Sequence, residues 1–340
     1  MTTLHRIGFA CKWINDASEV GGMKVNAADR DLNGRSTTMR WLREHKSEAE
    51  QRQWDIMNHN TTAAVKMIER VATLPAERRM VRLGSEMLQG YTQEDWQAWW
   101  QQTDVQNHLE RIFAPIGETA RRLDVRLSFH PGQFCVLASE HDVIVDRSIE
   151  EFEYHADMVR WMGYGKSFQD FKINVHISGR KGPEGIKDVL QRLSPEARNC
   201  ITIENDENAW GIDSSLELEK HCALVLDVHH HWIRTGEYIQ PSDDRCQRVI
   251  DSWRGVRPAM HYSVSREDYL VGHDPLTIPD YAQLLASGYK KQKLRAHSDF
   301  FWNKASNDWA LSFNDQFDIM CESKGKNLAS GQLYEQKKNK

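Results

Sequence analysis

The sequence predicts an α/β fold in which eight parallel strands and the helices between them close into a single (β/α)8 TIM barrel. Short apolar segments alternate with helical segments along the chain, which is the order that parallel strands joined by crossover helices require. About eight strand segments can be counted, and eight strands close a small barrel. Most of these segments also end in a side chain that can bind a metal ion, and barrels of this kind carry their active sites where the strands end.

Residues 223–232 show the strand pattern most clearly. Their first half is a continuous apolar run, which predicts a strand that is buried on both faces. The run ends in Asp227, and histidines at 229–231 follow it. By the same criteria, further strands are predicted at residues 5–11, 79–85, 125–130, 171–176, 200–204, 257–261 and 317–322.

Helical segments separate most of these strands. The longest are predicted at residues 48–74, 94–123 and 142–162. Trp96, Trp99 and Trp100 recur at helical spacing in the second of them, and we expect these rings to pack inside the protein. Residues 15–40 are polar and contain glycine, so they predict a long loop.

The domain organisation predicted from the sequence is simple. No linker or internal repeat divides the chain, so we expect a single catalytic barrel domain over residues 1–327. The chain from Lys324 onward is polar and rich in lysine, which predicts a frayed end. Residues 328–340 are therefore expected to form a polar C-terminal tail.

The composition limits the classes of function. Hydrophobic residues make up 40% of the 340 residues and charged residues 27%, as in a globular protein. The formal net charge is -5, so any contact with nucleic acid must use a local basic patch rather than a global positive field. Six scattered cysteines without a C-x-x-C pair fit reduced thiols, and no targeting peptide or membrane-spanning run is evident. We expect a cytoplasmic protein, and nothing in the sequence requires a protein partner.

Six of the predicted strands end in a residue that can bind a divalent metal ion. One histidine at a strand end is more often structural, but six such positions are not easily explained in that way. In a barrel all six would converge on one end. Two more histidines, at 230 and 297, follow the sixth strand and precede the last one. The candidate ligands are His130, His176, Glu204, Asp227, His230, His261, His297 and Glu322.

These donors suit a cluster of metal ions. Nitrogen and carboxylate ligands without a cysteine cluster are typical of zinc or manganese sites. Two or three such ions close together can activate water and clamp the oxygens of a phosphate ester that is being cut. Glu204 lies centrally in chain order and is a natural bridging ligand. We take Glu204, Asp227 and Glu322 as the candidate catalytic residues.

Several of the strand ends carry a family resemblance. The segments HPGQF at 130–134, ENDE at 204–207, DVHH at 227–230 and ESKGK at 322–326 resemble the strand-end motifs of the UV damage endonuclease family. The segments at 6–9 and 175–179 do so as well, and the similarity runs in order from about residue 5 to residue 327. More distant relatives of this family are the endonuclease IV-like and xylose isomerase-like barrels.

The resemblance implies an endodeoxyribonuclease for DNA repair. Such an enzyme nicks duplex DNA on the 5′ side of pyrimidine dimers and 6-4 photoproducts, without ATP, and uses two or three ions for which manganese is preferred and zinc is the alternative. The implied ligand sets are His130, His176 and Glu204 for a first ion, Glu204, Asp227, His261 and Glu322 for a second, and His230 and His297 for a third.

The resemblance also implies residues that contact DNA. Gln133 and Phe134 match the pair that family members push into the duplex at the lesion, and Phe9 matches a second aromatic near the damaged bases. Both ring positions are often tyrosine in the family, so their hydroxyl groups are absent here. Cations that follow strand ends could bind phosphates, although each could equally be a solvated loop charge. These cations are Lys12, Arg180, Lys181, Lys324 and Lys326.

Two positions depart from the family pattern. The family has a histidine ligand in the loop after the second strand, and residues 86–93 contain none. It also has a modified lysine two residues before the histidine of the seventh strand, where this chain has Ala259. The alternatives are an abasic-site endonuclease or a sugar isomerase on the same barrel, or a non-catalytic DNA-binding relative. The Gln133–Phe134 pair favours the nuclease, because an isomerase needs no lesion wedge, and a non-catalytic relative should retain few or no ions.

Overall fold

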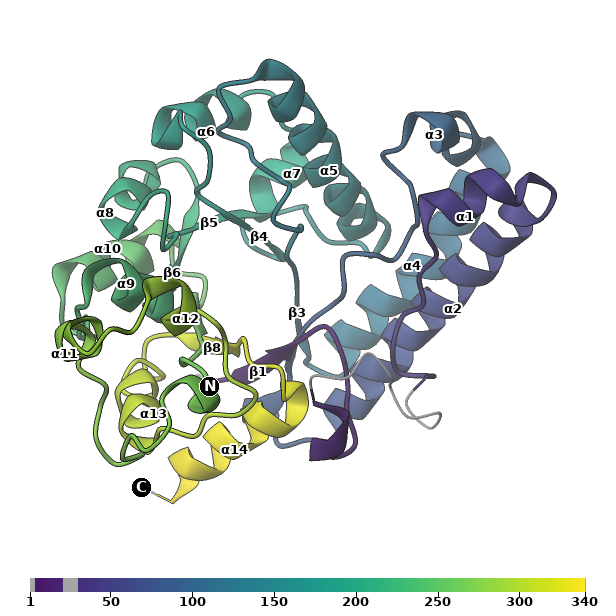
Figure 1. The fold of residues 1–340 in the computed structure, drawn as a ribbon. Coiled ribbons are helices and arrows are strands. Elements are labelled where there is room, and N and C mark those ends of the chain that lie inside the picture. The colour runs from purple at the N-terminus through teal and green to yellow at the C-terminus, as the bar shows by residue number, and fades with distance from the viewer. Residues whose placement is uncertain (1–3, 21–29, 340) are drawn as a thin grey trace.

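The computed structural model describes residues 4–20 and 30–339, and it contains a closed barrel of eight parallel strands (Figure 1). Each strand pairs with the next in sequence, and the last pairs with the first, so the predicted TIM barrel is confirmed. Every predicted strand segment overlaps one of the observed strands. These are β1 (Ile7–Ala10), β2 (Met80–Arg82), β3 (Arg126–Phe129), β4 (Lys172–His176), β5 (Ile201–Glu204), β6 (Ala223–Asp227), β7 (Ala259–Tyr262) and β8 (Asp318–Cys321).

Helices cover the outside of the barrel, and the long pair α2 and α4 runs side by side along one flank (Figure 1). The helices are α1 (Met39–Glu44), α2 (Lys46–Ala72), α3 (Glu94–Trp100), α4 (Thr103–Arg122), α5 (Asp142–Trp161), α6 (Gly182–Leu190), α7 (Pro195–Cys200), α8 (Ile212–Ser215), α9 (Val228–Thr235), α10 (Asp244–Ser252), α11 (Tyr281–Ala286), α12 (Lys291–Leu294), α13 (Lys304–Leu311) and α14 (Lys326–Lys338). Short 3-10 turns lie at η1 (Ala17–Glu19), η3 (Ala76–Arg78), η4 (Leu216–Leu218) and η5 (Glu267–Tyr269). None of the helices among the described residues has the length and apolarity to cross a bilayer.

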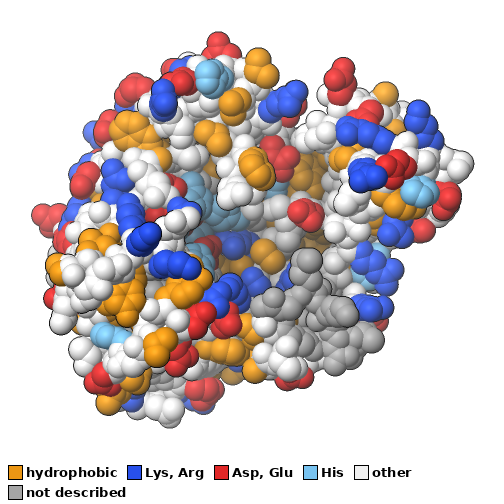
Figure 2. Space-filling view, viewed as in Figure 1, with side chains coloured by type: hydrophobic (Ala, Val, Ile, Leu, Met, Phe, Trp, Pro, Cys, Tyr) orange, Lys and Arg blue, Asp and Glu red, His pale blue; other side chains and the backbone are white. Residues whose placement is uncertain are grey.

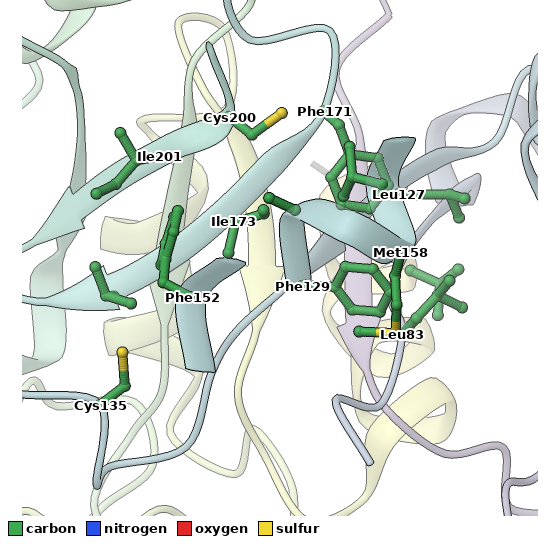
Figure 3. Packing of buried hydrophobic residues seen from close by; sticks show 14 of the residues in the cluster. Leu83, Leu127, Phe129, Cys135, Phe152, Met158, Phe171, Ile173, Cys200 and Ile201 are labelled. Atoms are coloured by element: carbon green, nitrogen blue, oxygen red, sulfur yellow. The ribbon is translucent and has the colours of Figure 1, made fainter. Parts of the chain in front are cut away.

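The hydrophobic core lies between the outer faces of the strands and the helices around them. Figure 3 shows one part of it, where Phe129 of β3 and Ile173 of β4 lie beside Phe152 and Met158 of α5. All four side chains are fully buried. Alternate residues of a strand point to opposite sides, so an outward-facing apolar residue leaves its two neighbours to face the barrel interior. This alternation is what turns the polar residues of β3 to β8 inward.

Two sequence predictions about helices were wrong. The segment 94–123 forms two helices, because Gln102 has an extended backbone that ends α3 and starts α4. The frayed tail predicted from Lys324 is largely a helix, α14, which packs against β1 and β8. Its Ala329 and Leu333 recur at helical spacing and are fully buried, but lysines on the other face conceal this pattern in the sequence. Of the predicted loop at 15–40, residues 21–29 lie outside the described part of the chain.

The amino ends of the strands enclose a buried cluster of charged side chains. Asp318 accepts hydrogen bonds from Arg126 Nη1 at 2.7 Å and from Arg257 Nε at 3.3 Å. The backbone N–H of Arg6 donates to the same carboxylate at 2.9 Å. The fully buried Trp253 lies beside them, with its ring centre 5.6 Å from the guanidinium carbon of Arg126. The carboxylate of Asp318 thus accepts hydrogen bonds from several donors within the protein.

Candidate metal centre

The predicted metal ligands lie together at the carboxyl end of the barrel, which we call the mouth. His176, Glu204 and Asp227 are the last residues of β4, β5 and β6, while His130 and Glu322 directly follow β3 and β8. Parallel strands of a barrel end on the same side, so side chains from different strands enter one hollow. Figure 2 shows histidine side chains inside this hollow, near the middle of the face in view.

Glu204 is the centre of this arrangement, and it is fully buried. Four histidine nitrogens approach its carboxylate: His261 Nδ1 at 3.0 Å, His130 Nε2 at 3.4 Å, His230 Nδ1 at 3.5 Å and His176 Nε2 at 3.7 Å. Burial alone would raise the pKa of Glu204, but the surrounding histidines outweigh burial and hold that pKa well below its ordinary value. A carboxylate in this position can be shared between neighbouring cations.

Three overlapping groups of donors have their ligand atoms within 4.8 Å of one another. The groups are His130, His176 and Glu204; Glu204, Asp227 and His261; and His130, His261 and Glu322. The first has the same members as the first predicted ligand set, and the second holds three of the four members of the second set. His230 and His297 have ring centres 6.4 Å apart and join no such group among the described residues, so the third ligand set stays a prediction.

Asn205 joins the ends of two neighbouring strands. Its side-chain amide donates to the carbonyl of Asp227 at 2.9 Å, and its side-chain oxygen accepts from the N–H of Asp227 at 2.8 Å. Asp227 in turn begins α9, because its carboxylate accepts the N–H of His230 at 2.7 Å. The histidines after Asp227 therefore stand on a helix that starts at the strand end, and this start fixes where His230 lies.

Further polar residues hold the ligands in place from behind. Asn174 donates its side-chain N–H to Glu204, and the hydroxyl of Thr202 donates to Asn174 Oδ1 at 2.7 Å. In the loop that follows β5, Asp206 Oδ2 lies 3.3 Å from His176 Nδ1. Contacts of this kind fix the ring orientation of a ligating histidine and leave its other nitrogen free for a metal.

The donors at the mouth fit a divalent metal ion. One carboxylate oxygen of Asp227, Oδ2, is buried and accepts no hydrogen bond from the part of the chain that the structure describes. Burial raises the pKa of Asp227 to about 8, since the charged form has lost its water without gaining enough partners. A cation that binds histidine nitrogen and carboxylate oxygen would complete this site, and zinc and manganese have that preference.

Two cations that contact the candidate ligands were missed by the sequence reasoning. Arg82, the last residue of β2, forms an ion pair with Glu322. Lys172, the first residue of β4, is only 4% exposed, and its Nζ lies 2.9 Å from His261 Nε2. Burial lowers the pKa of Lys172 to about 7. Strand alternation could have identified it, because Lys172 and His176 are an even number of positions apart on β4 and so face the same side.

The two positions that depart from the family pattern lie beside the ligands. Ala259 is buried on β7, two residues before His261. The segment 86–93 lines a cavity of about 700 Å³ that reaches His130. Glu151 of α5 also lines this cavity, and burial raises the pKa of its carboxyl group to about 7. The loop that lacks the family histidine thus borders an open space next to the metal centre.

The residues predicted to enter DNA have very different exposures. Phe134 is 84% exposed, and Gln133 beside it is also exposed, on the loop that follows β3. Phe9 is 1% exposed and packs edge-to-face against Trp13, with ring centres 5.9 Å apart. The prediction that Phe9 lies near damaged bases therefore finds no support in its position, which is that of a core residue on β1.

Most of the predicted phosphate-binding cations already have a carboxylate partner. Arg180 pairs with Glu140 at 3.3 Å, and Lys181 and Lys324 each lie 3.5 Å from an aspartate. Lys326 is half-buried, and burial lowers its pKa. Lys12 is exposed. These cations stay candidates for DNA contact, but a phosphate would have to compete with the existing ion pairs at three of the five.

Comparisons with known sequences agree with one another. A family model described as UV-endonuclease UvdE matches residues 6–339. The UV-damage endonuclease of Schizosaccharomyces pombe is 31% identical over 244 residues, which cover 67% of this chain and 36% of the yeast protein. The UV DNA damage endonuclease of Bacillus mycoides is 24% identical over 309 residues, which cover 86% of this chain and 85% of that protein. The match thus spans about a third of the yeast protein and most of the bacterial one.

Solved structures share the barrel. The crystal structure of SacUVDE superposes with a TM-score of 0.72 at 21% identity and covers 98% of both chains. Endonuclease IV from Thermus thermophilus superposes with a TM-score of 0.52 at 9% identity, over 82% of this chain and 95% of that one. At these identities the likeness concerns the fold alone. The family model, however, matches nearly the whole chain, and the protein therefore belongs to the UV-endonuclease family.

Proposed function

We propose that the protein is a metal-dependent DNA repair endonuclease that nicks duplex DNA on the 5′ side of UV photoproducts. The observation that carries the proposal is the buried Glu204 with four histidine nitrogens between 3.0 and 3.7 Å from its oxygens. Family membership and the names of the relatives support it. The exposed Phe134, on the loop that begins at the ligand His130, adds a means of probing the base stack.

The first two proposed ion sites draw on the donor groups at the mouth, and the third on the resemblance. His130, His176 and Glu204 would hold a first divalent ion, and Glu204, Asp227, His261 and Glu322 a second. A third would use His230 and His297. Bound ions, with manganese preferred and zinc as the alternative, would supply an activated water molecule and charge neutralisation at the phosphate.

The chain itself would position the reacting groups and select the damaged strand. Asn174 and Asp206 keep Glu204 and His176 in fixed orientations. Gln133 and Phe134 would occupy the space left when damaged bases leave the stack. Flipping costs a few kcal/mol and least for bases that damage has already distorted, while stacking of a ring on a base returns about 1–3 kcal/mol.

The activity is tested with a duplex oligonucleotide that carries one cyclobutane pyrimidine dimer. We expect manganese-supplemented protein to cut the damaged strand on the 5′ side of the dimer, and protein treated with a chelator to leave it intact. An undamaged duplex and a duplex with one abasic site serve as controls. Cleavage confined to the abasic duplex would support the abasic-site endonuclease instead, and metal-loaded protein that cuts neither would contradict the proposal.

The wedge is tested with the double variant Gln133→Ala/Phe134→Ala. Loss of stacking should lower the ratio of lesion to undamaged affinity about tenfold or more. Val143→Ala is a matched control, since Val143 is another exposed apolar side chain, located in the first turn of α5. A double variant that loses thermal stability but keeps its affinity ratio would show that Phe134 is a packing residue.

A further inference from the structure

A basic segment lies beside the metal centre and has no role in the proposed activity so far. Residues 289–295 contain four cations and no acidic residue. The segment includes α12 and lies in the connection between β7 and β8, on the mouth side of the barrel. Figure 2 shows lysine and arginine side chains gathered at the edge of the hollow, in the region where Figure 1 places α12.

A single acidic residue attaches this segment to the metal centre. Lys291 donates its Nζ to the carbonyl of Glu207 at 2.7 Å, and Arg295 Nη1 lies 3.2 Å from Glu207 Oε1. The other carboxylate oxygen of Glu207 lies 3.7 Å from Nε2 of His230. The basic segment is therefore held at the rim of the mouth by a residue that also contacts a candidate metal ligand.

The two remaining cations of the segment are available to a partner. Lys290 and Lys293 are exposed and form no ion pair among the described residues. Lys293 Nζ lies 4.6 Å from the ring centre of Tyr269, and the guanidinium carbon of Arg266 lies 5.1 Å from the same centre. Arg266 is neutralised by Asp268, which leaves the two lysines as free positive charge at this rim.

The segment lies across the mouth from the proposed wedge. Phe134 follows β3, and the basic segment follows β7, four strands further along a closed barrel of eight. The loops after such strands are on opposite sides of the mouth. Val271, which is 80% exposed and lies close in sequence to Tyr269, adds an apolar tip on this opposite side. A duplex that receives Phe134 would extend over the metal centre toward Lys290 and Lys293.

We propose that Lys290 and Lys293 bind the phosphate backbone of duplex DNA on the side of the mouth opposite Phe134. The proposal rests on the proposed function, because it takes duplex DNA as the partner. The net charge of the protein is -5, so backbone affinity has to come from local free cations such as these. Their contact would set the path of the duplex and leave lesion recognition to the wedge.

The test compares two double variants that remove the same charge. Lys290→Gln/Lys293→Gln alters the proposed contact, and Lys166→Gln/Lys220→Gln is the matched control. Lys166 and Lys220 are exposed, and they precede β4 and β6, at the opposite end of the barrel. Binding of a duplex that carries one pyrimidine dimer, and of its undamaged counterpart, is measured by fluorescence anisotropy over a series of salt concentrations.

We expect the first variant to lose about tenfold or more in affinity for both duplexes, with the lesion preference unchanged. Its slope of log K against log salt should be smaller by about 2, since each phosphate contact contributes about 0.9. The control should keep the wild-type slope. The conservative double variant Lys290→Arg/Lys293→Arg retains both positive charges and should therefore keep that slope as well.

The outcomes separate this inference from the proposed function. A wild-type slope in Lys290→Gln/Lys293→Gln, while wild-type protein binds and cuts dimer DNA, overturns the backbone contact alone. A loss of affinity without a change of slope also overturns it, because the effect would then be structural. If wild-type protein neither binds nor cuts dimer DNA, the proposed function fails and the contact with it.

Discussion

The two ends of the barrel interior both contain buried carboxylates, but these carboxylates differ in how fully the protein pairs them. At the amino end, Asp318 receives donors from Arg126, Arg257 and the backbone of Arg6, and its charge is balanced within the protein. At the mouth, Glu204, Asp227 and Glu322 face many histidines, and Asp227 Oδ2 has no hydrogen bond from any described residue. Charge that is balanced internally stabilises a fold, whereas a buried donor set left incomplete marks a place for a ligand.

Because the mouth is the end with incompletely paired carboxylates, we expect Glu204→Ala to reduce activity more than any other variant considered below. Removing the shared carboxylate should lower metal content and reduce nicking by about 1,000-fold, equivalent to about 4 kcal/mol of activation free energy. Affinity for DNA should stay within about twofold, because Glu204 is buried and would serve the metals rather than the phosphates. Metal analysis, a nicking assay and a binding titration measure the three quantities.

The control for this variant is Glu140→Ala, which removes an exposed carboxylate near the mouth. It should leave metal content and nicking unchanged. Wild-type turnover in Glu204→Ala with unchanged metal content would refute the central role of Glu204.

At the amino end, Asp318→Ala should destabilise the fold most. The variant leaves Arg126 and Arg257 in the barrel without their common partner, and breaking a buried pair in this way costs about 3–5 kcal/mol. Thermal and denaturant unfolding measure the loss. Manganese should stabilise the variant and wild type equally and so leave the difference between them unchanged, because the candidate metal ligands all lie at the other end. A difference from wild type that shrinks when manganese is added would mean that the two ends do not differ as described.

Lys172→Met should have a smaller effect, and one that metal relieves. Lys172 faces His261 at 2.9 Å, so its removal in metal-free protein should cost about 1–3 kcal/mol. Bound metal would supply positive charge near the same place, so manganese should reduce the difference in stability between the variant and wild type. Unfolding with and without manganese, with Lys220→Met as the exposed control, tests this. A loss that manganese leaves unchanged would assign Lys172 to packing alone.

The sequence predicted the barrel and the position of the candidate ligands, but it did not predict the contact between Lys172 and His261. Apolar runs that end in His130, Glu204 or Asp227 placed the ligands, because all strands of a parallel barrel end on one side. Lys172 was missed because it lies at the start of β4 and contacts a histidine on β7. A local sequence pattern does not reveal a contact between residues so far apart in the chain. The role predicted for Phe9 stays a prediction without structural support, because a motif match does not reveal whether a ring faces the core or the surface.

Glu151→Gln should show the smallest effect, and it should depend on pH. Burial raises the pKa of Glu151 to about 7 in the folded protein, above the ordinary value of 4.5. The folded state therefore favours the protonated carboxyl group, and wild-type stability should fall as pH rises from 4.5 through about 7. The variant lacks this titration, so the difference in melting temperature between it and wild type should grow over that interval and then level off. A difference in melting temperature that does not change with pH would contradict the raised pKa of Glu151.

The cavity beside His130 has a consequence for the supply of water. Hydrolysis consumes one water molecule per cut. A duplex lying over the mouth would cover the direct approach to the metal centre. The cavity of about 700 Å³ between α2 and the barrel reaches His130 and has room for many water molecules, so it could hold a store of water next to the reacting phosphate while DNA stays bound.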